Sequence, residues 1–158
     1  MLNIRKATKS DIELLIKLRF DYLTTEFGEL TPEESDKLNA QLSEYFPKHI
    51  EDDFIAVIGE IDGKVVGNAF MVISERPANP RTCATGKTAA VYNVLTYPEY
   101  RRQGIATNLL KILIDEAKKA NAVFVELSAS SMGKPVYEKL GFTEKTSSNY
   151  TDMKLKLN

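Results

Sequence analysis

The residues best suited to chemistry lie between a predicted strand and a predicted helix, at Tyr100-Arg101-Arg102-Gln103-Gly104-Ile105-Ala106-Thr107. Gly104 and Ala106 fall where the chain turns into the helix, and their small side chains leave the backbone open to close approach. The first N–H groups of a helix have no partner within it, and they lie at the positive end of its dipole. This arrangement suits a phosphate or a pyrophosphate, and Arg101 and Arg102 add positive charge at its rim.

A purely structural interpretation also exists, in which the glycine serves packing and the arginines form a solvated face. The strand and helix on either side favour the anion site. The segment is neither of the common phosphate loops, because the GxGxxG pattern is absent from it. Gly86-Lys87-Thr88 imitates the end of GxxxxGK[ST], but Arg81 stands where the first glycine belongs. A phosphate ligand other than ATP or NAD is therefore expected.

The elements before this segment begin with a brief strand at Leu2 and Ile4. Ser10 with Glu13 predicts a capping box at the start of a first helix. The apolar residues of that helix recur at helical spacing: Ile12, Leu15, Ile16, Phe20 and Leu23.

A second helix is predicted from Thr31, which caps it together with Glu34, with Pro32 at the first helical position. Pro47 is expected to end it, because proline interrupts the hydrogen bonds of a helix. The apolar stripe of this helix is Leu38, Leu42, Tyr45 and Phe46.

A hairpin and a β-α-β unit follow. Residues 54–61 form an apolar run, and Asp62-Gly63 suits the type I′ turn that leads into a return strand over residues 64–73. Residues 74–87 are predicted to be a long loop before a third strand.

This third strand, at residues 89–96, is followed by an amphipathic helix at 104–120 and a buried strand at 122–127. A short helix is then predicted at residues 134–140, closed by Gly141.

The tail alternates Met153, Leu155 and Leu157 with polar residues, which predicts a half-buried strand. The order of the elements indicates an α/β fold with a mixed, partly antiparallel sheet.

The composition excludes several classes of protein. The 158 residues include 21 Lys+Arg and 22 Asp+Glu, a formal net charge of −1, so no broad basic surface for nucleic acid is expected. No apolar run approaches the roughly 20 residues that cross a bilayer. One cysteine, Cys83, and one histidine, His49, exclude an internal disulfide and a Cys/His zinc site. We expect one cytoplasmic domain over residues 1–158, with no metal and no nucleic-acid or membrane partner.

Arg101-x-x-Gly104-x-Ala106 resembles the Arg/Gln-x-x-Gly-x-Gly/Ala signature of the GNAT superfamily of N-acetyltransferases. The upstream run from Val94 to Tyr100 and the downstream Tyr137-Glu138-Lys139-Leu140-Gly141-Phe142 resemble the same family at the same spacing. The resemblance implies a GNAT-like fold, with helices on both faces of a mostly antiparallel sheet. It also implies transfer of an acetyl group from acetyl-CoA, as cosubstrate, to a primary amine of a small molecule or a protein. Members of the family are often dimers, so a homodimer is compatible with it.

The resemblance also implies the residues of the acetyl-CoA site. The backbone N–H groups from Arg102 to Thr107 correspond to those that hold the pyrophosphate, and the preceding strand lies along the pantetheine arm. In the family reaction the amine attacks the thioester directly, and a backbone N–H, here assigned to Leu95, supports the oxyanion of the tetrahedral intermediate. The cofactor-binding residues expected on this basis are Val94, Leu95, Thr96, Arg101, Arg102, Gln103, Gly104, Ile105, Ala106 and Thr107.

Tyr137 is the catalytic residue that the resemblance implies. The family places a tyrosine four residues before the glycine of its Gly-Phe pair, where the phenol protonates the departing CoA thiolate as a general acid. Two positions differ from the common pattern: Ser130 replaces an asparagine that contacts the cofactor arm, and Gly133 replaces an alanine.

The sequence leaves the acceptor amine and any general base open. The acceptor site is expected between the first two helices and the loop at residues 74–87, where Arg76 and Arg81 could pair with a carboxylate. Asn93, Tyr92, Glu60 and Glu126 are interpreted as structural. Two other functions remain: transfer from another acyl-CoA, and CoA binding by a regulatory module without turnover.

Overall fold

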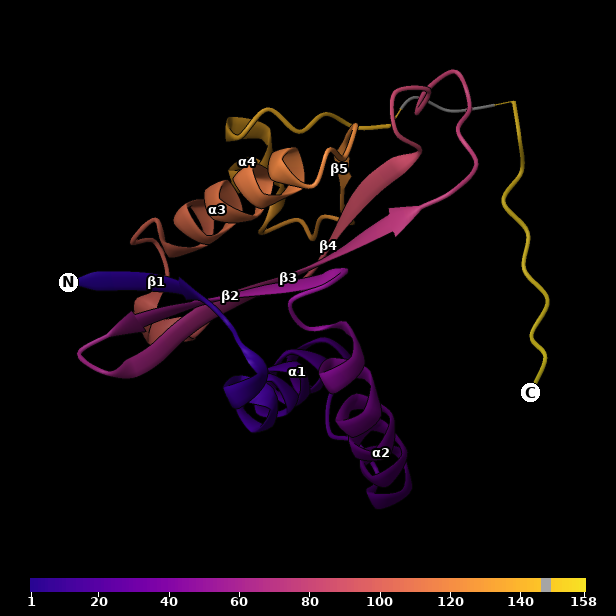
Figure 1. The fold of residues 1–158 in the computed structure, drawn as a ribbon. Helices are drawn as coiled ribbons and strands as arrows, with labels where there is room; N and C mark the ends of the chain where they lie inside the picture. The colour runs from indigo at the N-terminus through magenta and orange to yellow at the C-terminus, as the bar shows by residue number, and fades with distance from the viewer. Residues whose placement is uncertain (146–148) are drawn as a thin grey trace. The chain divides into compact units, whose positions relative to one another are not determined.

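A computed structural model describes residues 1–145 and 149–158 (Figure 1). The chain forms two compact units, Met1–Ser128 and Ala129–Asn158, and each is described by itself. The single domain expected over residues 1–158 stays a prediction. In chain order, the elements of the first unit are β1 (Leu2–Lys6), the 3-10 helix η1 (Lys9–Asp11), α1 (Ile12–Phe27), α2 (Pro32–His49), β2 (Phe54–Ile61), β3 (Lys64–Glu75), β4 (Lys87–Thr96), the 3-10 helix η2 (Pro98–Tyr100), α3 (Ile105–Lys119) and β5 (Val125–Glu126).

The first unit is built on a five-stranded sheet with the order β1-β2-β3-β4-β5. The pairs β1–β2, β2–β3 and β3–β4 are antiparallel, and β4–β5 is parallel. The turn between β2 and β3 has positive φ at Asp62 (49°) and Gly63 (75°), as the Asp-Gly pair predicts. The predicted mixed, mostly antiparallel sheet is confirmed.

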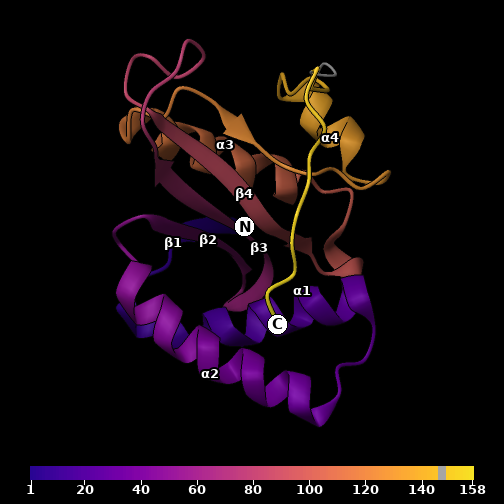
Figure 2. The same cartoon turned by 90° about the vertical axis from the view of Figure 1, so that its right-hand side faces the viewer.

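Helices cover both faces of this sheet. Figures 1 and 2 show α1 and α2 on one face and α3 on the other. Two glycines lie under α3: a Cβ at Gly67 would come 3.1 Å from Ile105 Cγ2, and a Cβ at Gly59 would come 3.6 Å from Leu109 Cδ2. Ile105 and Leu109 are buried, so the absence of side chains at these glycines lets α3 lie close to the strands.

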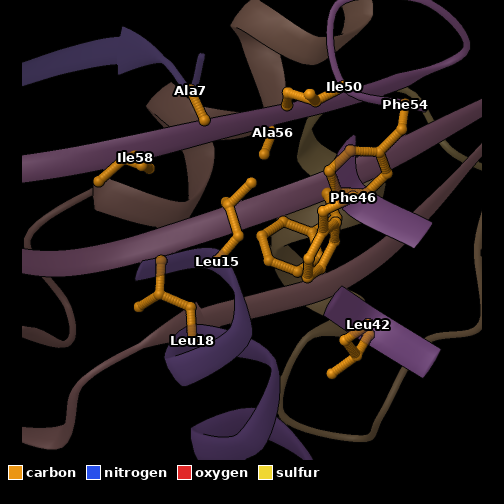
Figure 3. Close-up of a cluster of buried hydrophobic side chains, with 10 residues drawn as sticks. Ala7, Leu15, Leu18, Leu42, Phe46, Ile50, Phe54, Ala56 and Ile58 are labelled. Atoms are coloured by element: carbon orange, nitrogen blue, oxygen red, sulfur yellow. The ribbon is translucent and has the colours of Figure 1, made fainter. Parts of the chain in front are cut away.

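The core on the α1–α2 face combines aliphatic side chains with a group of phenylalanine rings (Figure 3). Phe46 lies 5.1 Å from Phe54 and 6.0 Å from Phe70, measured between ring centroids. The Phe46–Phe70 pair is edge-to-face, and the rings of Phe46 and Phe54 are tilted by 47° to each other. Edge-to-face pairs stabilise a packed core beyond the area that they bury. The cluster consists of Ala7, Leu15, Leu18, Leu42, Phe46, Ile50, Phe54, Ala56, Ile58 and Phe70.

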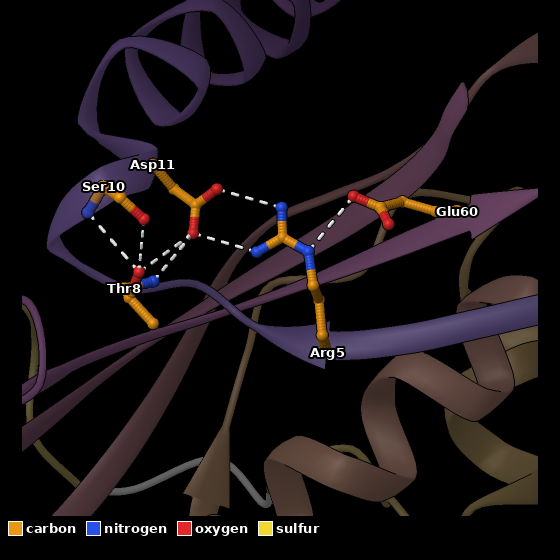
Figure 4. Close-up of polar contacts among 5 residues, drawn as sticks. All are labelled: Arg5, Thr8, Ser10, Asp11 and Glu60. Atoms are coloured by element: carbon orange, nitrogen blue, oxygen red, sulfur yellow. Dashed lines mark hydrogen bonds and ion pairs between the residues drawn. The ribbon is translucent and has the colours of Figure 1, made fainter. Parts of the chain in front are cut away.

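The cap of the first helical segment differs from the prediction of Ser10 with Glu13. Thr8 accepts a hydrogen bond from the Ser10 N–H, and the carboxylate of Asp11 accepts one from the Thr8 N–H at 2.8 Å (Figure 4). The difference arises because η1 precedes α1, which moves the capping box toward the N-terminus. Asp11 also accepts both Arg5 Nη1 and Nη2 at 2.9 Å, so the cap is joined to β1.

The second predicted cap is confirmed, and the predicted end of that helix is wrong. Thr31 and Glu34 form the capping box, with Pro32 in the first turn. Pro47 lies inside α2, which continues to His49. A proline at 47 removes the donor to the carbonyl of Ser43, and both residues are exposed, so water can bond to that carbonyl.

The last strand of the first unit is shorter than predicted, because β5 covers only Val125–Glu126 of residues 122–127. In the second unit, α4 (Lys134–Lys139) is followed by Gly141 with a φ of 95°, as predicted. The predicted strand at Met153, Leu155 and Leu157 is wrong: residues 151–158 are irregular, and these three side chains are 83–91% exposed. Alternation creates a half-buried strand only where a neighbouring strand pairs with it.

Candidate functional site

The connection from β4 to α3 is a tight, irregular loop. η2 begins it, with Tyr100 N–H donating to Tyr97 O and Arg101 N–H donating to Pro98 O. The backbone then takes positive φ at Arg102 (63°) and at Gly104 (76°). Such left-handed residues turn successive N–H groups toward one side, which forms an anion-binding concavity.

The N–H groups of this loop are available to a ligand. Asn108 is the first residue of α3 whose N–H is bonded within the chain, to Gly104 O at 3.0 Å. Within the described part of the chain, the N–H groups of residues 102–107 have no acceptor. Residues 101–104 are exposed, so the donors lie at the surface, at the N-terminus of a 15-residue helix. The arrangement suits a phosphate group.

Two side chains hold this loop in place. Ile105 is buried and packs against the sheet near Gly67. Arg101 Nε donates to Thr96 O at 3.2 Å and joins the loop to the end of β4. Gly104 itself has open space around it: an added Cβ would meet no atom of the described residues within 4 Å. The space above Gly104 is therefore free for a bound group.

Within the first unit, one edge of β4 is largely unpaired, because β5 pairs only with Ala89 and Ala90. Tyr97 N–H donates to Val66 O on β3. Along a strand the direction of these bonds alternates, so Leu95 also faces β3, and Thr96 faces the uncovered side. The contact of Thr96 O with Arg101 agrees with this direction. Thr96 Oγ1 is buried with no partner among the described groups.

A bulge interrupts β4 beside that edge. Asn68 pairs with Leu95 but Phe70 pairs with Tyr92, so β4 has an extra residue here, and Asn93 takes a φ of 55°. The Asn93 side chain is buried and bonds to α1, with Nδ2 donating to Leu18 O at 3.3 Å. Its contacts agree with the structural interpretation of Asn93.

A polar cluster joins α1 to the end of β4. Tyr97 Oη and Lys17 Nζ both donate to Asp21 Oδ2, at 2.5 and 2.6 Å. Burial, together with the nearby carboxylate, raises the pKa of the Tyr97 phenol. The hydrogen bond from Lys17 to Asp21 raises the pKa of the ammonium group. No local pattern in the sequence predicts this cluster, because only the fold brings residues 21 and 97 together.

Tyr137 lies on α4, in the second unit, and is half-buried. Its ring packs edge-to-face against Phe142, with 5.9 Å between the centroids. A Cβ at Gly133 would come 2.9 Å from Tyr137 Cε2. The glycine that replaces the family's alanine therefore leaves room for the ring of this tyrosine.

Several other candidates have local partners. Glu60 accepts a hydrogen bond from Arg5 Nε, and His49 Nδ1 lies 2.7 Å from Asp53 Oδ1. Cys83 is a free, exposed thiol, and the side chains of Arg76 and Arg81 are exposed on the loop between β3 and β4. These surroundings agree with structural roles for Glu60 and His49.

Arg19 of α1 was not identified from the sequence. Its Nη1 donates to Asn93 Oδ1 at 3.2 Å, so it reaches the bulge of β4. An arginine on the buried side of a helix, between apolar residues, was the signal in the sequence that could have revealed it.

Over residues 1–145 and 149–158, no group of three or more His, Cys, Asp or Glu side chains has the arrangement of a metal site. None of the helices in those same ranges combines the length and the apolar character of a membrane span.

A family model described as "Acetyltransferase (GNAT) family" matches residues 16–142. A structure of a predicted acetyltransferase with acetyl-CoA from Clostridium acetobutylicum superposes with a TM-score of 0.80 and 28% identity, over 98% of this chain and 96% of that chain. Glucosamine 6-phosphate N-acetyltransferase of Arabidopsis thaliana is 29% identical over 92% of this chain and 89% of its own length. The ribosomal protein bS18-alanine N-acetyltransferase of Escherichia coli K12 is 39% identical over 61 residues, which span 37% of this chain and 41% of that enzyme.

Proposed function

Because the chain belongs to the acetyltransferase (GNAT) family, we propose that it transfers the acetyl group of acetyl-CoA to a primary amine. The observation that carries this proposal is the run of N–H groups at residues 102–107, around Gly104, that have no acceptor within residues 1–145 and 149–158. These donors suit the pyrophosphate of CoA, and the open space at Gly104 admits it. The Clostridium acetobutylicum relative, which is solved with acetyl-CoA, supports acetyl-CoA as the cosubstrate.

The pantetheine arm follows the uncovered edge of β4 in this proposal. Because β5 pairs only with Ala89 and Ala90, the later residues of β4 leave backbone groups for an extended ligand. Val94, Leu95 and Thr96 form this part of the strand, and an arm bound here carries its thioester toward the bulge at Asn93.

The amine nitrogen attacks the thioester carbonyl carbon, and a tetrahedral intermediate with a negative oxygen forms. The C–S bond then breaks, the amine loses a proton, and the CoA thiolate gains one. A backbone N–H on β4 supports the oxyanion. The alternation of hydrogen bonds favours Val94 for this donor rather than Leu95, because Leu95 faces β3.

Tyr137 is the general acid that protonates the thiolate in this proposal. A phenol retains its proton at neutral pH, so it can donate that proton to a departing thiolate as a general acid. Support comes from the fit of the ring between Gly133 and Phe142 and from its match to the family pattern.

The named relatives indicate the general class of the acceptor and not its identity. One relative acetylates the alanine of a ribosomal protein, and another acetylates glucosamine 6-phosphate. The acceptor of this chain is accordingly a primary amine, on a small molecule or on a protein.

Tyr137→Phe tests the proposal, because it removes the hydroxyl and retains the ring that packs on Phe142. With purified protein and a panel of amines, release of the CoA thiol is followed together with calorimetric binding of acetyl-CoA. We expect turnover to fall by about 100-fold, within the usual range for a general acid, and the affinity for acetyl-CoA to stay within twofold. Unchanged turnover would exclude Tyr137 as the acid.

Acetyl-CoA binding without thiol release for any amine would favour a non-catalytic CoA-binding module. Faster thiol release from a longer acyl-CoA would identify a different donor.

A further inference from the structure

Arg19 is a partly buried cation that lacks a carboxylate partner among the residues the structure describes. The ionisable groups that face it are the phenols of Tyr22 and Tyr92. Its Cζ lies 5.8 Å from the centroid of the Tyr22 ring. Burial lowers the pKa of the Arg19 guanidinium, but this group stays protonated in proteins. Arg19 therefore holds a positive charge that no acid of the described chain neutralises.

Arg5 is an arginine with a structural role in the same fold, and its partners differ from those of Arg19. Its guanidinium bonds to two carboxylates, those of Asp11 and Glu60, at 2.9–3.1 Å (Figure 4). Five N–H groups in a planar fork suit such paired acceptors. Among the described residues, the fork of Arg19 has one hydrogen bond, to Asn93 Oδ1, so most of its donors remain for another acceptor.

A buried chain of amides fixes the position of that fork. Asn93 Oδ1 accepts from Arg19, while Asn93 Nδ2 donates to Leu18 O and, at 2.8 Å, to Asn68 Oδ1. Asn93 and Asn68 are 2% and 0% exposed. Arg19 donates to Asn93, and Asn93 donates to Asn68, so all these hydrogen bonds point the same way. Asn68 Nδ2, the last donor of the series, has no partner among the described groups. Buried amides held in this way keep the guanidinium in one place.

The fork lies beside the position proposed for the reacting thioester. Asn93 is the bulge residue of β4 and is followed directly by Val94, the donor proposed for the oxyanion. Tyr92, which also faces Arg19, is 50% exposed, so this side of the strand is open to solvent. A group bound by Arg19 would be part of the acceptor rather than of CoA, whose pyrophosphate is assigned to residues 102–107.

We propose that Arg19 binds an anionic group of the acceptor, a carboxylate or a phosphate, so that the enzyme selects amines that carry such a group close to the reacting nitrogen. This inference rests on the proposed acetyl transfer from acetyl-CoA. Arg76 and Arg81 are weaker candidates for the same contact, because both are exposed on a loop and exposed ion pairs contribute little.

Pairs of amines that differ in one anionic group test the proposal. Thiol release is measured at saturating acetyl-CoA with tyramine against tyrosine and with ethanolamine against O-phosphoethanolamine. We expect the anionic member of at least one pair to have a KM at least tenfold lower. Arg19→Gln should raise that KM at least tenfold and leave the KM of the neutral member within twofold. Lys64→Gln, which removes one positive charge from the exposed β2–β3 hairpin, is the control and should change neither value. Equal KM values within both pairs, or a selective loss in Arg81→Gln in place of Arg19→Gln, would overturn the proposal.

A binding measurement tests it without turnover. The site at residues 102–107 is first saturated with CoA, and the Arg19 Nε–H and Asn93 side-chain amide resonances are followed during titration with acetate and with inorganic phosphate. We expect saturable shifts with one of the two anions, and no saturable shift of the Asn93 amide in Arg19→Gln. The anion with the lower midpoint distinguishes a carboxylate from a phosphate.

The absence of saturation with both anions would contradict the role of Arg19, while CoA binding in the same samples reports separately on the proposed function. If Arg19→Gln does not fold, Arg19→Lys serves as the variant. It retains the charge and loses the fork, and its midpoint should rise at least threefold. A midpoint equal to that of the wild type would count against the proposal.

Discussion

Gly104 is the residue on which the proposed acetyl-CoA site most depends. Its φ of 76° and the empty space around it leave room for the pyrophosphate. We expect Gly104→Ala to weaken acetyl-CoA binding at least tenfold in calorimetry, because its methyl group enters that space. Gly63→Ala is the matched control: Gly63 also has positive φ (75°) and no atom within 4 Å of an added Cβ, but it lies in the β2–β3 turn. Both variants should lose about 1 kcal/mol of stability from backbone strain. Equal affinities in the two variants would contradict the site.

Asp11 makes stability depend on pH. The hydrogen bond from Arg5 lowers the pKa of the Asp11 carboxyl, so folding favours its ionised form. This contribution is complete above the ordinary aspartate pKa of about 3.9 and is lost as the pH falls through the lowered pKa of the folded state. We expect Asp11→Asn to reduce the free energy of unfolding by about 1–3 kcal/mol at pH 7, and the difference from wild type to shrink below about pH 4.

Glu33→Gln is the control for Asp11→Asn, and the free energy of unfolding of both variants is measured in urea at several pH values. Its carboxylate pairs with Lys37, but the two side chains are 77% and 74% exposed. Glu33→Gln should therefore change stability by about 0.5 kcal/mol or less. A cost for Asp11→Asn that does not vary between pH 7 and pH 3 would show that its ionisation is not linked to folding.

At the scale of elements, substitutions of the two glycines under α3 are expected to have opposite effects on stability. An added Cβ at Gly67 would lie 2.8 Å from Leu95 O and 3.1 Å from Ile105 Cγ2, so β4 or the start of α3 must move. At Gly59 the nearest atoms are 3.5–3.7 Å away, which is ordinary contact. We expect Gly67→Ala to cost about 1–3 kcal/mol in thermal or urea unfolding, and Gly59→Ala to stay within about 0.5 kcal/mol or to stabilise.

Gly67→Ala should also weaken acetyl-CoA binding, because Ile105 and Leu95 belong to the proposed site. Similar losses of stability in the two variants would mean that the spacing between α3 and the strands is not set at Gly67.

The sequence predicted elements well where the signal was local. The Asp62-Gly63 turn and the Thr31 capping box depend on a few adjacent residues, and both are confirmed. The helix end predicted at Pro47 was wrong, because the effect of a proline depends on whether the carbonyl four residues earlier is exposed to water. The strand predicted around Leu155 was wrong, because an alternating pattern does not show whether another strand pairs with that segment.

The same limit applies to the candidate site. The loop at Gly104 was identified because strand, glycine and helix are contiguous in the sequence. The contact of Arg19 with Asn93 joins residues 74 positions apart, so only the fold brings it about. The direction in which Leu95 faces follows from the register of β3 with β4, and the sequence does not encode that register in any local pattern.

At the scale of the whole molecule, the proposed cofactor site depends on a sheet that is incomplete on one side. β4 pairs along its length with β3, but with β5 only at Ala89 and Ala90. In the described part of the first unit, the loop that follows β4 ends in N–H groups that have no acceptor. An uncovered strand edge that leads to an anion site matches a ligand with an extended amide-containing arm and a pyrophosphate, as in CoA.

Calorimetric titration of the purified protein with acetyl-CoA and with desulfo-CoA tests this central claim most directly. Both ligands contain the pyrophosphate and most of the pantetheine arm, and desulfo-CoA lacks the thiol. The account predicts saturable binding of both, with one site per chain. Absence of binding by either ligand would contradict it.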